Sequence, residues 1–396
     1  QVVLDDNTSG HTISRMNFYN NLLDETHLAL RESCARFALK EIAPHAFEWE
    51  EAGTFPLELY AKAAQAGVLG VGFPEEIGGA GGGPLHMIMS IEGGMRGGST
   101  GVSIGLGSLA IALPPIVHSK NIDLIDRYVR PTLAGKKIAA LAVTEPDAGS
   151  DVANIRTRAE RQGDQYKVNG SKLFITSGVR ADYLTTLVRT SDDLHTGLSF
   201  LMIDKNRPGV TVSRALKKTG WWASDTAELS FNNVEVPVQN LIGKEGSGFQ
   251  TLMRNFQMER LALAAYGCAT AQIVLEESER YVRERKVFGK TLAGFQVTRH
   301  KLAEMATRVL AATTLTYQVA ARMEQKENVM KEVAMTKNFA AETAINVTHD
   351  AVQLFGGMGY MRETLVERLS RDARILSIGG GTHEIMNEII GKCMEL

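Results

Sequence analysis

The segment at residues 248–285 constrains the fold of this chain more than any other. It reads GFQTLMRNFQMERLALAAYGCATAQIVLEESERYVRER and contains no proline over more than thirty residues. Two further stretches with helical patterning follow it, at 301–325 and 329–357. Because long helices without internal caps usually pack against one another, residues 243–396 are predicted to form a helical domain of the four-helix-bundle type.

The middle of the chain has a different pattern. Short runs rich in β-branched and aromatic residues, such as YLTTLVRT, LSFLMID and TAELSFNNVEV, alternate with turn residues between 137 and 242. Asn169–Gly170 is predicted to be a hairpin turn between two such runs. This region is therefore expected to be a β domain, with a barrel-like sheet.

The N-terminal part is again helical. Leu23, Leu30 and Phe37 approximate one helical stripe, and glycine-rich breaks separate the later segments, so 16–136 is predicted to be a helical domain. Residues 1–15 are polar and aperiodic and are interpreted as a leader, either native or added by cloning. The α–β–α order defines an α+β multidomain protein, and the missing βαβ alternation argues against a nicotinamide-binding Rossmann domain.

Composition narrows the function classes. The 396 residues have a formal net charge of −2, so no overall basic field favours nucleic acid or acidic lipid. Three widely spaced cysteines indicate a reducing compartment and no cysteine zinc site, and no metal is predicted. The apolar run at 109–117 is too short to cross a bilayer, so no membrane association is expected.

Three strings occur in an order that points to a family. They are AVTEPDAGSDVAN at 142–154, RKVFGK at 285–290 and QLFGGMGYMRETLVERLSRD at 353–372. Together they resemble the acyl-CoA dehydrogenase flavoproteins, and the likeness runs from about residue 20 to the C-terminus. The first string departs from the family at Asn154, where a small residue is usual.

The resemblance implies that the chain binds FAD. The loop at 142–154 offers hydroxyl groups and a Gly/Pro-shaped backbone that a pyrophosphate or a flat ring could approach. An aromatic face is kept at Phe174, where family members usually have Trp. The implied flavin contacts are Val143, Thr144, Ser150, Phe174, Thr176, Gly356, Thr382 and Glu384. Those implied to reach the flavin of a neighbouring subunit are Arg285, Phe288, Gln296, Gln353 and Gly357. A homo-oligomer, in the family a tetramer, follows from this sharing.

The segment SIGGGTHEIM near the C-terminus lacks a side chain that the chemistry needs. Family members remove a proton beside a thioester carbonyl, and many place the required carboxylate where this chain has Gly380. A subset that includes isovaleryl- and long-chain-type enzymes has it on a long helix, which corresponds to Glu259 in NFQMERLALA. Glu259 is therefore predicted to be the base. Ser150, Arg260, Gly379 and Gly380 are predicted to contact the substrate, with backbone N–H groups near Gly380 facing the thioester carbonyl.

The predicted function is FAD-dependent dehydrogenation of an acyl-CoA, branched or of medium to long chain, to a trans-2-enoyl-CoA. An electron-transfer flavoprotein is the expected acceptor, and the compartment is a bacterial cytoplasm or a mitochondrial matrix. Two alternatives stay open on the same fold. One is an oxidase or monooxygenase that passes electrons to oxygen, and the other is a scaffold that lost its base, which Gly380 favours and Glu259 opposes.

Overall fold

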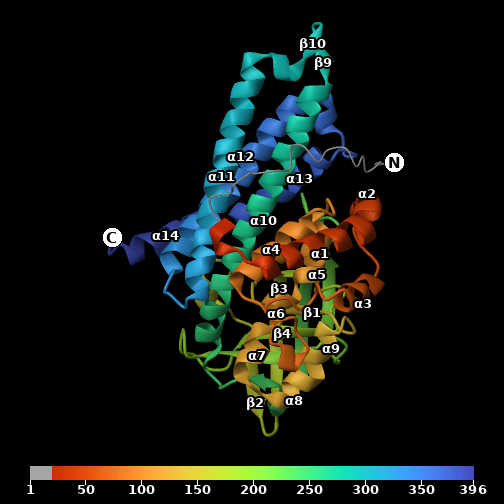
Figure 1. The fold of residues 1–396 in the computed structure, drawn as a ribbon. Helices are drawn as coiled ribbons and strands as arrows, with labels where there is room; N and C mark the ends of the chain where they lie inside the picture. The colour runs from red at the N-terminus through yellow and green to blue at the C-terminus, as the bar shows by residue number, and fades with distance from the viewer. Residues whose placement is uncertain (1–19) are drawn as a thin grey trace.

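A computed structural model describes residues 20–396, so the predicted leader at 1–15 lies outside the described residues. The chain forms a helical N-terminal part, a β-sheet and a helical C-terminal part in that order, and the bundle extends away from the sheet (Figure 1). This confirms the predicted α+β class.

The N-terminal part consists of short helices packed on one another and on the sheet. Asp24 caps the first of them by accepting hydrogen bonds from the backbone N–H groups of Thr26 and His27, and α1 packs along α4. The helices are α1 (Glu25–Glu41), α2 (Ala46–Ala52), α3 (Glu58–Gln65), α4 (Pro84–Met95), α5 (Thr100–Gly107), α6 (Leu109–Ala112), α7 (Pro114–Ser119), α8 (Ile122–Leu124) and α9 (Arg130–Leu133).

One segment of this part, Thr100–Ser119, is long and apolar enough to cross a membrane by length and composition. It is longer than the run at 109–117 that the sequence pattern singled out. In the structure it is divided among α5, α6 and α7, and 61% of its most apolar window is buried inside the protein. It therefore forms part of the interior.

The middle part is one mixed sheet of eight strands in the order β6-β7-β3-β2-β4-β5-β8, with β1 paired in parallel to β4. Both faces of the sheet are covered at β4 and β5, where almost every residue is buried. The strands are β1 (Ala139–Ala142), β2 (Arg158–Gln162), β3 (Gln165–Thr176), β4 (Tyr183–Arg189), β5 (Leu198–Asp204), β6 (Val210–Ala215), β7 (Thr226–Pro237) and β8 (Leu241–Ile242).

The hairpin prediction at Asn169–Gly170 is wrong. These residues lie inside the continuous strand β3, and the turn between β2 and β3 falls at 163–164. The register of β3 against β7 shifts between Val168 and Gly170, and the Asn169 side chain accepts a hydrogen bond from the backbone N–H of Asn233. Asn169–Gly170 therefore lies at an irregularity in the pairing of β3 with β7, where glycine tolerates the φ of +148°.

The C-terminal part is the predicted helical bundle. The long helices α10 (Gly248–Glu284), α11 (Gln296–Glu324) and α12 (Met330–Phe355) pack on one another, and α13 (Leu365–Ala373) and α14 (His383–Cys393) pack on α12. A two-stranded hairpin of β9 (Lys286–Val287) and β10 (Lys290–Thr291) joins α10 to α11 at the end of the bundle far from the sheet (Figure 1). The core of the bundle is continuous with that of α4.

Candidate active site

A cavity of about 860 Å³ lies where the three parts of the chain meet. Its walls come from the N-terminal helices, from the ends of β1 and β3, from α10 and from the loop before α14. Its volume is in the range of small-molecule and cofactor sites. Ten of the predicted site residues line it, namely Val143, Thr144, Ser150, Phe174, Thr176, Glu259, Arg260, Gly379, Gly380 and Thr382.

A buried lysine holds the predicted flavin loop against β3. Lys172 is fully buried, and its Nζ donates to the carbonyl of Val143 over 2.7 Å and to Oε1 of Glu145 over 2.8 Å. Burial lowers the pKa of Lys172 to about 8, opposed by the charge of Glu145. The backbone N–H of Leu173 also donates to the carbonyl of Thr144 over 2.8 Å. The loop and the strand therefore present Thr144 and Phe174 to the cavity together.

Phe174 is held in an unusual backbone conformation. Its φ of +60° is rare for an aromatic residue, and the register of β3 against β7 shifts between Lys172 and Ile175. The ring is 64% exposed on the cavity wall, although an aromatic side chain normally finds a packing partner. A strained, open aromatic face beside the hydroxyls of Thr144 and Thr176 fits a flat, partly apolar ring such as a flavin.

Glu259 projects from α10 into the cavity wall. Its Oε2 is shielded from solvent and has no hydrogen-bond partner among the described residues. Burial raises its pKa to about 7, against the opposing positive charges of Arg260 and Lys337. A carboxyl group with a pKa near neutrality, and with no hydrogen bond to that oxygen, is well suited to proton transfer.

The three glycines line the cavity, and Gly380 lies beside Glu259. A side-chain carbon built on Gly380 would lie 3.7 Å from Oε1 of Glu259. A carboxylate on this loop position would therefore lie close to the carboxylate that the helix provides. Arg260 does not pair with its neighbour Glu259 and instead donates from Nε to the carbonyl of Gly380 over 3.1 Å. Thr382 caps α14 through a hydrogen bond from the N–H of Ile385, as the sequence pattern predicts.

The remaining predicted contacts lie outside the cavity of their own chain. Arg285, Phe288, Gln296, Gln353, Gly356 and Gly357 are all exposed at the end of the bundle that bears the β9–β10 hairpin. The stacked rings of Tyr281 and Phe355, 4.0 Å apart, hold the ends of α10 and α12 together there. Glu384 is exposed in the first turn of α14, outside the cavity lining. Their assignment to a flavin site remains a prediction.

Several residues around the cavity were not found by sequence reasoning. Lys337 is fully buried on α12 and donates from Nζ to the carbonyl of Gly381 over 2.6 Å, which ties the glycine loop to the bundle. Trp221 lines the cavity with a φ of +53°, and Tyr266 lines it while sharing a hydrogen bond with Ser103. Of these residues only Lys337 could have been noticed in the sequence, because it is a lysine within an otherwise apolar helix face.

Matches to family models cover most of the chain. Residues 24–136, 140–234 and 246–395 match the acyl-CoA dehydrogenase N-terminal, middle and C-terminal domains, respectively. A Bacillus subtilis acyl-CoA dehydrogenase is 38% identical over 93% of this chain and 97% of its own length. The mouse mitochondrial long-chain specific acyl-CoA dehydrogenase is 36% identical over 94% of this chain and 87% of its own.

Solved structures agree with these matches. A probable acyl-CoA dehydrogenase from Mycobacterium abscessus is 53% identical and superposes with a TM-score of 0.93 over 94% of this chain and 99% of its own. An FAD complex of PigA, 29% identical, superposes with a TM-score of 0.89 over 94% of this chain and 98% of its own. The predicted family and three-part fold are confirmed, and the chain belongs to the acyl-CoA dehydrogenase family of FAD-binding flavoproteins.

Proposed function

We propose that this chain dehydrogenates an acyl-CoA thioester to a trans-2-enoyl-CoA with Glu259 as the general base. The observation that supports this most strongly is the meeting of Glu259 and Gly380 at one point of the cavity wall, where the loop has no side chain and the helix offers a carboxylate. This proximity supports an enzyme over the scaffold alternative, because a carboxylate lies beside the loop position that lacks one.

The residues present fit FAD. The cavity combines the open aromatic face of Phe174 with the hydroxyls of Thr144, Ser150 and Thr176, and the Lys172 clamp fixes the backbone between them. Bound FAD supplies the acceptor for the hydride that leaves the β-carbon of the substrate.

The chain itself supplies the proton acceptor and the geometry. Ionised Glu259 takes the proton from the carbon next to the thioester carbonyl, and its lack of a hydrogen bond at Oε2 leaves that oxygen available. Arg260 and Lys337 hold the glycine loop through the carbonyls of Gly380 and Gly381, and their positive charges favour the ionised base. The apolar residues around the cavity keep water from the reacting carbons.

We further propose that the flavin site is completed by a second copy of the chain in a homo-oligomer, in this family a tetramer. The far end of the bundle exposes Phe288 by 96%, Tyr360 by 80% and Val297 by 71%. Large apolar side chains gathered at one end of a helical bundle favour association. Arg285 lies beside them and would bring a positive charge to the neighbour's cofactor.

The substrate is proposed to be branched or of medium to long chain, with an electron-transfer flavoprotein as acceptor. The compartment is proposed to be a bacterial cytoplasm or the mitochondrial matrix. An oxidase on this fold would pass electrons to oxygen, and one similar structure is a prolyl acyl carrier protein oxidase, 28% identical with a TM-score of 0.88.

Single-turnover bleaching without oxygen tests the proposal. A series of acyl-CoA thioesters should bleach the yellow flavin, and Glu259→Gln should slow this by about 100-fold or more while FAD and ligand binding persist. Glu277→Gln, on the same helix but outside the cavity lining, is the matched control and should bleach normally. Near-normal bleaching in Glu259→Gln would exclude it as the base. Rapid reoxidation of the bleached enzyme by air would favour the oxidase.

A further inference from the structure

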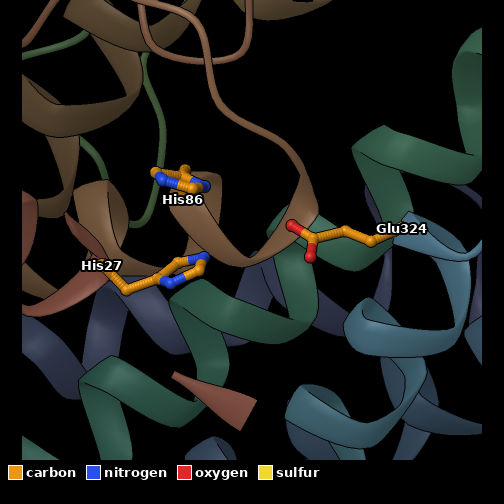
Figure 2. Close-up of side chains that lie close together, drawn as sticks. All are labelled: His27, His86 and Glu324. Atoms are coloured by element: carbon orange, nitrogen blue, oxygen red, sulfur yellow. The ribbon is translucent and has the colours of Figure 1, made fainter. Parts of the chain in front are cut away.

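A cluster of potential metal ligands lies outside the active site, where the N-terminal helices meet the bundle. His27 on α1, His86 on α4 and Glu324 at the end of α11 each offer one ligand atom, and these atoms all lie within 4.8 Å of one another. Figure 2 shows the two imidazole rings and the carboxylate, each from a different element. Because the three residues are far apart in the chain, no sequence motif reveals them.

His27 has the arrangement expected of a metal ligand. Its ring is buried, with only 6% of the residue exposed, and Nδ1 lies 2.8 Å from Oδ1 of Asp24. The backbone N–H of Asp24 also lies 3.2 Å from this Nδ1, so the two contacts require opposite tautomers of the ring. In the tautomer whose Nδ1–H donates to the carboxylate, Nε2 has a lone pair, and Nε2 is buried without a hydrogen-bond partner among the described residues. Metal-binding histidines are commonly oriented by a carboxylate in this way. A buried, unpaired acceptor is costly, and a cation would satisfy it.

The other two side chains are held beside His27. The rings of His27 and His86 lie 4.0 Å apart between centroids. Oε1 of Glu324 accepts a hydrogen bond from the backbone N–H of Leu85 over 3.0 Å, which fixes the carboxylate at the start of α4 and leaves it a second oxygen. A side-chain carbon on Gly83 would lie 2.6 Å from that Oε1, so a larger residue there would displace the carboxylate. Nδ1 of His86 lies 3.4 Å from the backbone N of Gly83, and Nε2 lies 3.2 Å from Oγ1 of Thr26, so an ion bound to this ring replaces one of these two contacts.

We propose that His27, His86 and Glu324 bind a zinc-type divalent ion that fastens α1 and α4 to the end of α11. Two imidazoles and one carboxylate suit Zn²⁺, which accepts four-coordinate geometry with water in the remaining position. Mg²⁺ and Ca²⁺ prefer oxygen ligands throughout and should not replace it. The ligands come from both helical parts of the chain, so the ion would be structural and its loss would loosen their contact.

Zinc titration of the full chain in its FAD-loaded form, after treatment with a chelator, tests this inference. Calorimetry should give one tight zinc site per chain, and saturating zinc should raise Tm by about 2 °C or more, with no effect of Mg²⁺. His27→Gln and Glu324→Gln should each weaken binding by at least about 10-fold. Asp24→Asn should weaken it by about 10- to 100-fold through His27 alone, since Asn also caps a helix well.

His45→Gln is the matched control, because His45 is exposed and lies outside the cluster, and it should bind zinc as the unchanged chain does. Glu324 is exposed, so its variant should fold even where the buried His27 variant does not. Failure to bind zinc at one equivalent, or affinity unchanged in both Glu324→Gln and Asp24→Asn, would overturn the proposal. Anaerobic bleaching should stay normal in Glu324→Gln, which separates this test from that of the dehydrogenase.

Discussion

The buried base should make the protein less stable as the pH rises, and Glu259→Gln should remove this effect. The pKa of Glu259 is raised from 4.5 to about 7, mainly by burial. Between these values the folded chain keeps the proton while the unfolded chain releases it, so the free energy of unfolding falls as pH rises and then levels off above 7. The full difference corresponds to about 3 kcal/mol.

This magnitude is measurable as a change in Tm. For a chain of this length, about 3 kcal/mol corresponds to roughly 4 °C, from the usual unfolding entropy per residue. Tm of the FAD-loaded protein should be recorded from pH 5 to pH 8 for the unchanged chain, for Glu259→Gln and for the control Glu277→Gln. The glutamine variant should gain by roughly 3 °C relative to the unchanged chain between pH 5 and pH 8, because about a quarter of the full difference has already developed at pH 5. A difference that is the same at pH 5 and pH 8 would refute the assignment of a buried, neutral carboxyl to Glu259.

Three further variants test other parts of the site. Gly380→Glu added to Glu259→Gln should restore part of the bleaching, and no recovery in single-turnover bleaching would contradict the shared position. The added side chain should lower the free energy of unfolding by about 1–2 kcal/mol, because φ is +66° there and the new carbon would lie 2.6 Å from Cδ1 of Leu263. Arg285→Glu should lower flavin content and loosen the oligomer in light scattering, and a fully flavinated, intact oligomer would exclude its proposed role. Lys172→Met should destabilise the fold by about 3–5 kcal/mol in denaturant titration, because it leaves Glu145 buried without its partner; a change below about 1 kcal/mol would contradict the clamp.

The local sequence pattern was sufficient to predict the long helices and to identify the family. The proline-free segment that became α10 needs only its own residues to be helical, and the three motif strings needed no structure to be matched. The assignment of Glu259 also began in the sequence, from a glycine where a carboxylate is usual. The prediction of a turn at Asn169–Gly170 was wrong, because the same dipeptide suits a hairpin turn and an irregularity within a strand. The pairing of β3 with β7 decides between these two structures.

The environment of each side chain was decided only by the tertiary structure. The raised pKa of Glu259 depends on its burial, which outweighs the opposing charges of Arg260 and of Lys337 from another helix, and the loop clamp depends on Lys172 from β3. The same holds for the histidine and carboxylate cluster, whose members come from three helices. Periodicity in a sequence reports which face of an element is buried, but distances between elements are set by packing. The sequence by itself therefore determined the helices and strands and the types of reactive side chain present, whereas packing determined which of these side chains lie close together.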